Sequence, residues 1–353
     1  MIISRRKLLT LSGGILAAAP FIRLPQVAYA ESLAAKDPVI TDIAYPFGRA
    51  MYGTIIRATP SLKGKVVKKI KQNELIDLEG QTEIAGTGYN PVWYKTTDGY
   101  VHSAFVFPSL NTLNDPVDTV GETGFWGELT VPMSAVRAAP SEQAGKRYAA
   151  FTGMTFKVKA IQKDKAGKAW YELEEDNWSY TKSATFLPAE QLRPLSQDDF
   201  APLSAEVPAQ EKRIEISLKK QIAVAYEGDK EVRRVRIASG MGGYETPTGK
   251  HYIYVKTPGQ RMFGGAVADT GNYDLPAIPW VSYFTSYGVS FHGTYWHNDY
   301  GRPRSHGCAN VSPEDAHWIF RWSNPVPVFE ERWTRVSRKS KMKEEGTLVI
   351  VTY

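Results

Sequence analysis

The chain has 353 residues, a formal net charge of +6, and a composition that is 42% hydrophobic and 23% charged. A chain of this length is too long for one small core, so we expect two or three domains. The first 30 residues hold four basic residues and no acid, which leaves 39 basic against 37 acidic residues in the remainder. This near balance argues against the basic surface that is typical of nucleic-acid-binding proteins.

Residues 1–30 have the order of an export signal. A basic start at Arg5, Arg6 and Lys7 precedes an apolar run from Leu8 to Ile22, and Ala28-Tyr29-Ala30 offers a small-residue cleavage site. The stretch SRRKLLT resembles a twin-arginine signal, with leucine and threonine in place of the usual phenylalanine and lysine; an ordinary secretory signal is the alternative. The apolar run is too short to span a bilayer comfortably. We therefore expect an exported protein that meets the membrane only transiently, during export.

Two later segments, residues 45–110 and 125–192, repeat each other weakly. The shared landmarks are an R-x-x-P-S turn, a W-Y pair and a tyrosine-led stretch, found at 57–61, 93–94 and 100–104 in the first segment and at 137–141, 170–171 and 180–184 in the second. Repetition at this scale predicts duplicated modules. Short alternating runs between turn residues are typical of small β-barrels. Both segments resemble bacterial SH3-like domains.

Residues 193–210 contain three prolines and no periodic apolar pattern, which predicts a linker. Strand-like alternation resumes from Ile214, and residues 211–353 are expected to form a third, β-rich domain with a few short helices. One helix start is clear, because Ser312 supplies an N-cap, Pro313 the first turn and Asp315 an acid three residues after the cap. The sequence RSHGCAN lies just before this helix.

The only cysteine of the chain, Cys308, lies in that stretch. Three of the six histidines, His292, His297 and His306, fall within FHGTYWHNDYGRPRSHGC beside it. Thiol chemistry at neutral pH needs a base that raises the thiolate fraction, and imidazole has the appropriate pKa. His292 follows an expected strand that would hold it firmly. The backbone N–H groups of Gly307 and Cys308 are natural donors to a tetrahedral oxyanion.

Three other interpretations of this cluster were weighed. A zinc site could use the three histidines and Cys308, but there is no paired CxxC or HExxH spacing to support it. A papain-like protease has the order Cys, His, Asn, whereas His292 precedes Cys308 here. In the third, the histidines cap turns and the thiol is a buried, inert side chain.

The stretch HGTYWHNDYGRPRSHGCAN is similar to the signature of the L,D-transpeptidase (YkuD-type) catalytic domain, in which a histidine is followed after a short loop by S/T-H-G-C-hydrophobic-N/R. Upstream, ASGMGGYETPTGKHYIYV resembles the TPTG segment of that family, and GTLVIVTY resembles its closing strand. The resemblance covers about residues 211–353. It implies a mainly β protein in which two SH3-like modules precede a β-rich catalytic domain.

The resemblance also implies a mechanism. Cys308 would attack a peptidoglycan stem peptide and release D-alanine, His292 would transfer the proton, and the Gly293 carbonyl would complete the triad. The other motif residues would bind substrate or the oxyanion: Ser305, His306, Gly307 and Asn310. Three aromatic residues could line the pocket or simply pack: Tyr283, Tyr295 and Trp296. Asp299 is a nearby carboxylate that the family's triad does not require.

The partners implied are peptidoglycan stem peptides, in the periplasm or the extracytoplasmic space of the cell wall, with no cofactor, metal or nucleic acid. The product implied is a 3→3 cross-link, formed when an amine of a neighbouring stem attacks the thioester. Two alternatives stay open: an L,D-carboxypeptidase, in which water attacks the thioester, and a non-catalytic wall-binding protein whose SH3-like modules carry the function.

Overall fold

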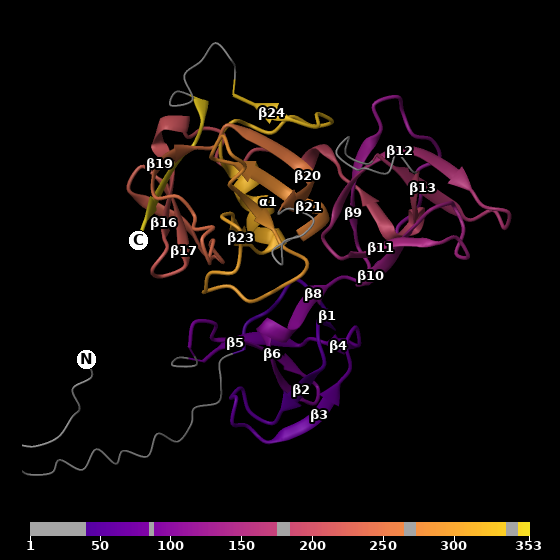
Figure 1. The fold of residues 1–353 in the computed structure, drawn as a ribbon, viewed down its shortest axis with the longest axis horizontal. Helices are drawn as coiled ribbons and strands as arrows, with labels where there is room; N and C mark the ends of the chain where they lie inside the picture. The colour runs from indigo at the N-terminus through magenta and orange to yellow at the C-terminus, as the bar shows by residue number, and fades with distance from the viewer. Residues whose placement is uncertain (1–39, 85–87, 175–183, 265–272, 337–344) are drawn as a thin grey trace, which may run out of the picture. The chain divides into compact units, whose positions relative to one another are not determined.

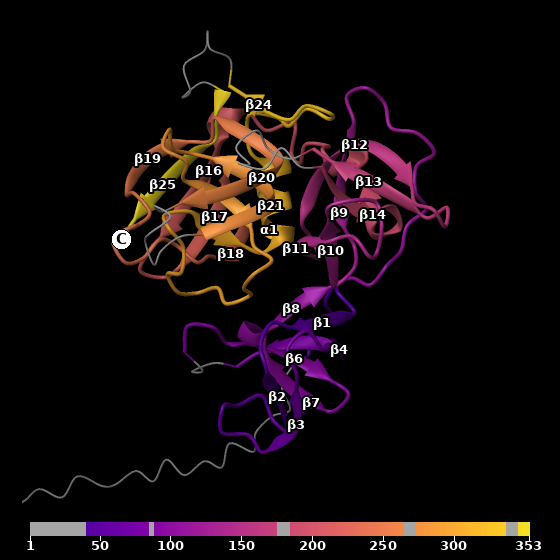
Figure 2. The ribbon, with the colours of Figure 1, turned by 45° about the vertical axis from the view of Figure 1, so that its right-hand side comes forward.

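The computed structural model describes residues 40–84, 88–174, 184–264, 273–336 and 345–353. The expected export signal, residues 1–30, lies outside them. The described chain is built mainly from strands, as the sequence predicts, with one α-helix among these residues (Figures 1 and 2). Its 3-10 helices are Ser103–Phe105, Ala189–Gln191, Gln197–Asp199 and Ala209–Glu211. None of the helices in the described ranges has the length and apolar character needed to cross a membrane.

The first module holds eight strands in two sheets, ordered β4-β1-β8 and β3-β2-β7-β6-β5. The strands are β1 (Phe47–Ala50), β2 (Thr54–Arg57), β3 (Val66–Ile70), β4 (Leu75–Asp77), β5 (Gly80–Glu83), β6 (Val92–Thr96), β7 (Gly99–His102) and β8 (Val106–Ser109). Ile56, Val101 and Val106 lie at the centre of its core, with almost no exposed surface. This module therefore buries apolar side chains of its own.

The second module is one seven-stranded sheet, ordered β11-β10-β14-β13-β12-β9-β15. Its strands are β9 (Phe125–Leu129), β10 (Met133–Arg137), β11 (Lys146–Phe151), β12 (Thr155–Lys163), β13 (Ala169–Leu173), β14 (Thr185–Pro188) and β15 (Leu192–Pro194). Neighbouring strands of this sheet pair antiparallel. Its core joins Leu129, Val158 and Leu187 to residues of the third domain such as Val281.

The repeated R-x-x-P-S turns form equivalent hairpins. The Arg57 guanidinium donates to the Gly64 carbonyl at 2.7 Å, and the Arg137 guanidinium donates to the Ala144 carbonyl at 3.0 Å. In each hairpin the register shifts immediately before the arginine. The arginine thus closes the same turn in both modules. The SH3-like character of the modules stays a prediction.

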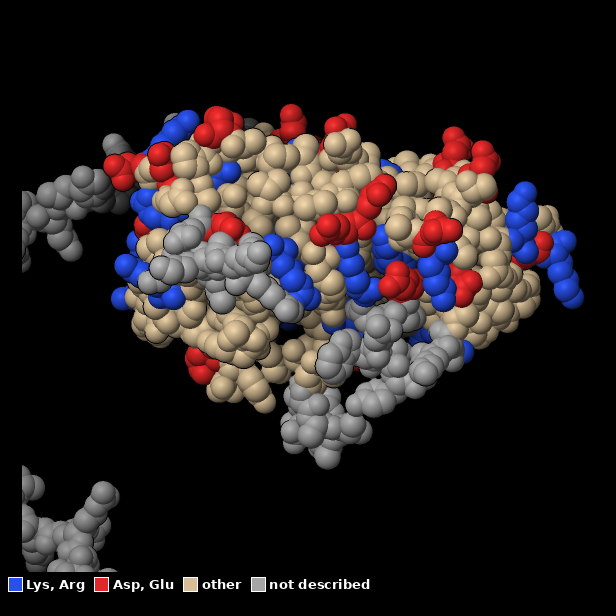
Figure 3. Space-filling model, turned by 90° about the horizontal axis from the view of Figure 1, so that it is seen from above, with Lys and Arg blue, Asp and Glu red and all other residues tan. Residues whose placement is uncertain are grey.

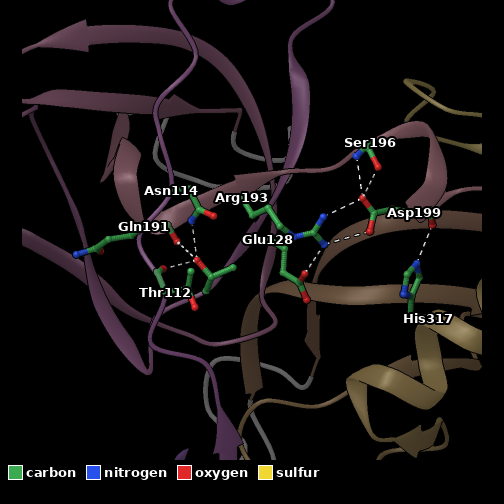
Figure 4. Close-up of polar contacts among 9 residues, drawn as sticks. Thr112, Asn114, Glu128, Gln191, Arg193, Ser196, Asp199 and His317 are labelled. Atoms are coloured by element: carbon green, nitrogen blue, oxygen red, sulfur yellow. Dashed lines mark hydrogen bonds and ion pairs between the residues drawn. The ribbon is translucent and has the colours of Figure 1, made fainter. Parts of the chain in front are cut away.

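The segment 193–210, expected to be a linker, packs against its neighbours. Leu195 and Phe200 are almost fully buried in the core of the third domain. The Arg193 guanidinium bridges the carboxylates of Glu128 and Asp199 at 2.8 and 3.0 Å (Figure 4). A charged side chain that bonds two partners from different elements restricts both of them. The segment is therefore ordered by contacts at several points.

The third domain has two five-stranded sheets, ordered β18-β17-β16-β25-β19 and β23-β22-β21-β20-β24. Their strands are β16 (Lys212–Ser217), β17 (Ile222–Glu227), β18 (Lys230–Arg236), β19 (Gly249–Tyr252), β20 (Val255–Gly264), β21 (Tyr273–Tyr283), β22 (Ser290–Gly293), β23 (Ala309–Val311), β24 (Thr334–Arg335) and β25 (Leu348–Thr352). Helix α1 (Pro313–Trp322) packs on β21 and β22. Residues of both sheets and of α1 share one core, to which Ile214, Phe291 and Phe320 belong.

Helix α1 begins where the sequence predicts. The Ser312 hydroxyl accepts a hydrogen bond from the Asp315 N–H at 3.0 Å, and Pro313 occupies the first turn, where its missing N–H costs nothing. The Asp315 carboxylate in turn accepts from the Arg233 guanidinium on β18 at 2.7 Å. The N-terminus of the helix is therefore tied to the first sheet of its domain.

The C-terminus of α1 is capped by a buried lysine. Lys256 is fully buried, and its Nζ donates to the carbonyls of Phe320 (2.7 Å) and Ser323. Burial drives the pKa of Lys256 well below its usual value, and the positive charge of Lys212 adds to this. The amine bonds both carbonyls, so its removal takes a donor away from two carbonyl oxygens at the C-terminus of the helix.

We expect Lys256→Met to destabilise the protein by about 1–3 kcal/mol, since two buried carbonyls lose their donor. The folded pKa of Lys256 is lower than the unfolded one, so unfolding takes up a proton in the window between them. Wild-type stability therefore rises with pH through that window, and the deficit of the variant grows with it. Urea unfolding of both proteins at pH 7 and pH 9 checks this. Equal stability at both pH values would contradict it.

Candidate functional site

The backbone places the expected nucleophile and base on two neighbouring parallel strands. His292 lies on β22, and Cys308 comes directly before β23. The two strands pair in register, with Phe291 opposite Ala309 and His292 opposite Asn310. A parallel ladder fixes the spacing between its strands. The two side chains are thus held by a sheet and not by a loop alone.

The His292 ring is oriented by the carbonyl of the next residue. Its Nδ1 lies 3.0 Å from the Gly293 oxygen, so Nδ1 carries the proton and donates it to that carbonyl. This leaves Nε2 as the basic nitrogen when the ring is neutral. Gly293 is required by space, because a Cβ at this position would lie 2.9 Å from atoms of both Pro279 and Pro313.

The Cys308 thiol is partly exposed and reduced. Its Sγ lies 3.6 Å from the Ser290 hydroxyl and 3.7 Å from the Gly288 carbonyl. Burial by itself raises the pKa of the thiol, but hydrogen bonding to His292 and the charge of that ring, with hydrogen bonds from Ser290, outweigh burial and lower the pKa below its usual value. A larger share of the side chain is therefore thiolate at neutral pH.

The loop before Cys308 is held from the TPTG segment. The Thr246 hydroxyl donates to the Gly307 carbonyl at 2.7 Å and accepts from the Gly240 N–H at 3.0 Å. Gly240 lies so close that a Cβ there would meet the Gly307 backbone at 2.8 Å. Gly307 itself has a φ of +112°, in the region that favours glycine. These contacts fix the backbone on the N-terminal side of the thiol.

The backbone N–H groups of Gly307 and Cys308, which were expected to bind an oxyanion, have different surroundings. The Gly307 N–H donates to the Ser305 hydroxyl at 3.1 Å, and that hydroxyl donates to the Cys308 carbonyl at 2.6 Å. The Gly307 N–H is therefore already committed within the motif. The Cys308 N–H makes no hydrogen bond to another residue in the part of the chain that the structure describes. Of the two expected oxyanion donors, the Gly307 N–H is thus paired within the motif, and the role of both donors stays a prediction.

His306 and Asn310 lie on different sides of the motif. His306 is exposed, with its ring centroid 4.8 Å from that of Tyr244 and 5.0 Å from that of Tyr273. Asn310 is buried, and its Nδ2 lies 3.1 Å from Nε2 of His297. His306 thus faces the surface beside Cys308, whereas Asn310 faces the interior.

Tyr283, Trp296 and Tyr295, the aromatic residues expected to line the pocket or to pack, differ in their surroundings. Burial raises the pKa of Tyr283, and the negative charge of the Cys308 thiolate adds to this. The Trp296 ring centroid is 5.9 Å from that of His292. Tyr295 instead donates to the Pro276 carbonyl at 2.8 Å and stacks on Phe151 of the second module. Tyr295 is therefore a packing residue.

Sequence reasoning missed Ser290, Thr246 and Tyr273 at this site. Burial and the Cys308 charge raise the pKa of Tyr273, as they do for Tyr283. Ser290 could have been found, because alternation along β22 points residues 290 and 292 to the same face. Thr246 lies in the TPTG stretch, whose sequence gives no sign of the Gly307 contact.

The described residues contain no group of three or more His, Cys, Asp or Glu side chains arranged to hold a metal ion. His297, one of the ligands in the zinc interpretation, is almost fully buried. Burial lowers the pKa of His297 to about 3, with Arg304 contributing, so its ring is neutral at neutral pH. Its two nitrogens are taken up by contacts with the Asp299 N–H and with Asn310.

Part of the chain that carries this site matches the model of a known protein family. Residues 211–351 match the family model described as YkuD, the L,D-transpeptidase catalytic domain. A search of curated proteins gave no match.

Solved structures that resemble the chain include L,D-transpeptidase 3 of Mycobacterium tuberculosis, with 22% identity over 40% of this chain and 61% of that one and a TM-score of 0.32. An L,D-transpeptidase variant of Enterococcus faecium has 22% identity over 40% of this chain and 50% of that one, with a TM-score of 0.31. The chain thus spans only about half to three fifths of the length of these enzymes.

Proposed function

We propose that this protein is a cysteine acyltransferase that remodels peptidoglycan, because residues 211–351 match the model of the YkuD L,D-transpeptidase catalytic domain. The observation that carries the proposal is the pair formed by His292 on β22 and Cys308 directly before β23. His292 lowers the pKa of the Cys308 thiol, and the Gly293 carbonyl holds Nδ1 of the His292 ring. Geometry of this kind prepares a thiolate for attack on a carbonyl.

The reaction begins with attack of the Cys308 sulfur on the carbonyl carbon of the third stem residue. The thiol proton passes to Nε2 of His292, and the negative charge on the carbonyl oxygen is stabilised by the Cys308 N–H. Collapse of the tetrahedral intermediate breaks the peptide bond, and His292 returns the proton to the leaving amine of D-alanine. A thioester remains on Cys308.

The amine of a neighbouring stem then attacks the thioester, loses a proton to His292 and releases the free thiol, which gives a 3→3 cross-link. If water attacks instead, the enzyme is an L,D-carboxypeptidase. The remaining motif residues are proposed to act in substrate binding: Ser305, through the loop that it bridges, and His306, at the surface beside the thiol. Asn310 is proposed to support the site from the interior.

We propose that the reaction takes place outside the cytoplasm, with residues 1–30 as the export signal and residues 45–110 and 125–192 as SH3-like modules. Basic and acidic side chains are interspersed on the face shown in Figure 3. We propose peptidoglycan stem peptides, and not nucleic acid, as the partner, in line with the near balance of basic and acidic residues after residue 30.

Intact-protein mass spectrometry after incubation with a purified tetrapeptide stem tests the proposal. A mass increase equal to the tripeptide acyl group, with release of D-alanine, is the expected result. Addition of an excess of a second stem then distinguishes the products: a cross-linked dimer indicates transpeptidation, and a free tripeptide indicates the carboxypeptidase. Folded protein that yields neither adduct nor D-alanine would move the function to wall binding.

A further inference from the structure

The connecting loop, residues 294–304, joins the proposed base to the proposed nucleophile, and the first module holds it. The Asn298 amide donates to the Tyr94 hydroxyl on β6 at 2.7 Å. The Arg49 guanidinium on β1 donates to the Tyr295 carbonyl at 3.4 Å. Both contacts join a module at the start of the chain to the loop that precedes the SHGC motif. The module is therefore in a position to influence that loop.

The centre of this interface is a buried carboxylate. Asp299 is 1% exposed, and its oxygens accept from the guanidinium groups of Arg302 and Arg304, each at 2.8 Å. The Asn90 amide of the first module donates to its Oδ1 at 3.1 Å, and the Tyr89 hydroxyl lies 3.4 Å from its Oδ2. A buried carboxylate is costly unless such partners surround it. Asp299 thus depends on the first module for part of its hydrogen bonding.

The backbones of the connecting loop and of the first module also approach each other closely, at Gly301 and Tyr89. Gly301 has a φ of +108°, and a Cβ at this position would lie 2.3 Å from the Tyr89 carbonyl. The Arg302 guanidinium lies 4.8 Å from the centre of the Tyr89 ring. Only glycine fits where the two backbones meet. The loop therefore takes this path against residues 89 and 90.

A chain of contacts runs from Asp299 to the catalytic strands. The Asp299 N–H donates to Nδ1 of His297 at 3.3 Å, and Nε2 of His297 lies 3.1 Å from the Asn310 amide. Asn310 pairs with His292 across the β22–β23 ladder and lies two residues after Cys308. A shift of the loop at Asp299 would therefore reach both members of the proposed pair.

We propose that Asn90 and Asp299 are positioning residues, through which the first module holds the connecting loop and so sets Cys308 against His292. The inference rests on the proposed function for the reaction that it serves, but the reactivity of the thiol can be measured without a stem peptide. It assigns the first module a part in building the catalytic site, in addition to any contact that it makes with the cell wall.

The two residues allow an isosteric exchange. The Asn90 Oδ1 accepts from the Val92 N–H and the Ser103 hydroxyl, each at 3.2 Å. In Asn90→Asp a carboxylate keeps both of these acceptor roles, loses the donor to Asp299 and places a second negative charge beside the Asp299 carboxylate. In Asp299→Asn the side chain keeps its size and gains a donor. The double variant exchanges donor and acceptor and restores one hydrogen bond between the two positions.

The test is the rate of Cys308 alkylation by iodoacetamide between pH 5 and pH 10, on the full chain and its variants. We expect each single variant to slow alkylation at pH 7 by about tenfold and to move the midpoint of the pH profile upward, since a small displacement of a reacting group has effects of at least this size. The double variant is expected to recover most of the rate. The control is Glu83→Gln, which breaks the ion pair of Glu83 with Arg236, a link from the same module to β18 and not to the loop.

Unchanged profiles in both single variants would overturn the proposal. So would single-variant losses that the double variant does not recover, because they would indicate a general packing defect and not this hydrogen bond. A wild-type protein that forms no acyl adduct, but whose alkylation follows the expected pattern, would refute the proposed function and leave the positioning role standing.

Discussion

Replacing Cys308 by alanine is expected to abolish acyl-enzyme formation and D-alanine release. The chain has no other thiol, and the adjacent Ser290 hydroxyl is a poor nucleophile at neutral pH because it is not ionised. Activity should fall to the detection limit, which for removal of a nucleophile is a loss on the order of 10⁴-fold or more. Mass spectrometry with the tetrapeptide stem measures it directly.

The control for this variant is its fold. Cys308 is partly exposed, and its sulfur lies as far as 3.6 and 3.7 Å from the Ser290 hydroxyl and the Gly288 carbonyl, so the thermal unfolding midpoint of Cys308→Ala should stay close to that of the wild type. An adduct of tripeptide mass that persists in the folded variant would show that another side chain carries the acyl group. Ser290 would then be the first to replace.

Replacing His292 by alanine has the second largest expected effect. The ring supplies the interactions that bring the pKa of the Cys308 thiol below its usual value, so without it burial dominates and the pKa rises. The thiolate fraction at pH 7 falls, and the general base and acid is lost as well. We expect acylation to slow by about 10²–10⁴-fold, the range typical of general acid–base catalysis.

The pH dependence of alkylation separates the two causes. In the wild type the rate rises with pH through the lowered pKa of the thiol, and in His292→Ala the rise should occur at higher pH. His251→Gln is a matched control, because the His251 ring packs on Phe284 and bonds the Pro247 carbonyl. A midpoint that stays in place in His292→Ala would show that another group sets the thiol pKa.

The site residues that the sequence predicts belong to short motifs, so each can be recognised from its near neighbours in the chain. His292 and Cys308 stand at fixed places around a short loop, and Ser312, Pro313 and Asp315 mark a helix start within four residues. The mainly β fold follows from alternation and turn residues in the same way. Interactions between close neighbours in the chain leave their signature in the sequence.

The other contacts join residues that are far apart in the chain. Asn90 bonds Asp299 across more than half of the sequence, and Thr246 reaches the Gly307 carbonyl from the segment between β18 and β19. No spacing rule connects such residues. The Gly307 N–H was unpredictable for another reason: Ser305 could equally have faced a substrate, and only the structure shows its hydroxyl bridging the motif.

The position of β25 has a consequence for how the third domain forms. This strand lies between β16 and β19, with Arg213 paired to Leu348 in a parallel ladder. Bringing residues 213 and 348 together costs chain entropy before the contacts between the two strands can form. Domains that depend on such long-range pairing fold slowly. The order of synthesis therefore matters: a growing polypeptide cannot complete this sheet until its β25 residues have left the ribosome. His292 and Cys308 are both synthesised before β25, but their neighbours Phe291 and Ala309 pack in the core that β25 completes. Thiol reactivity should therefore appear late in refolding, in step with closure of the sheet.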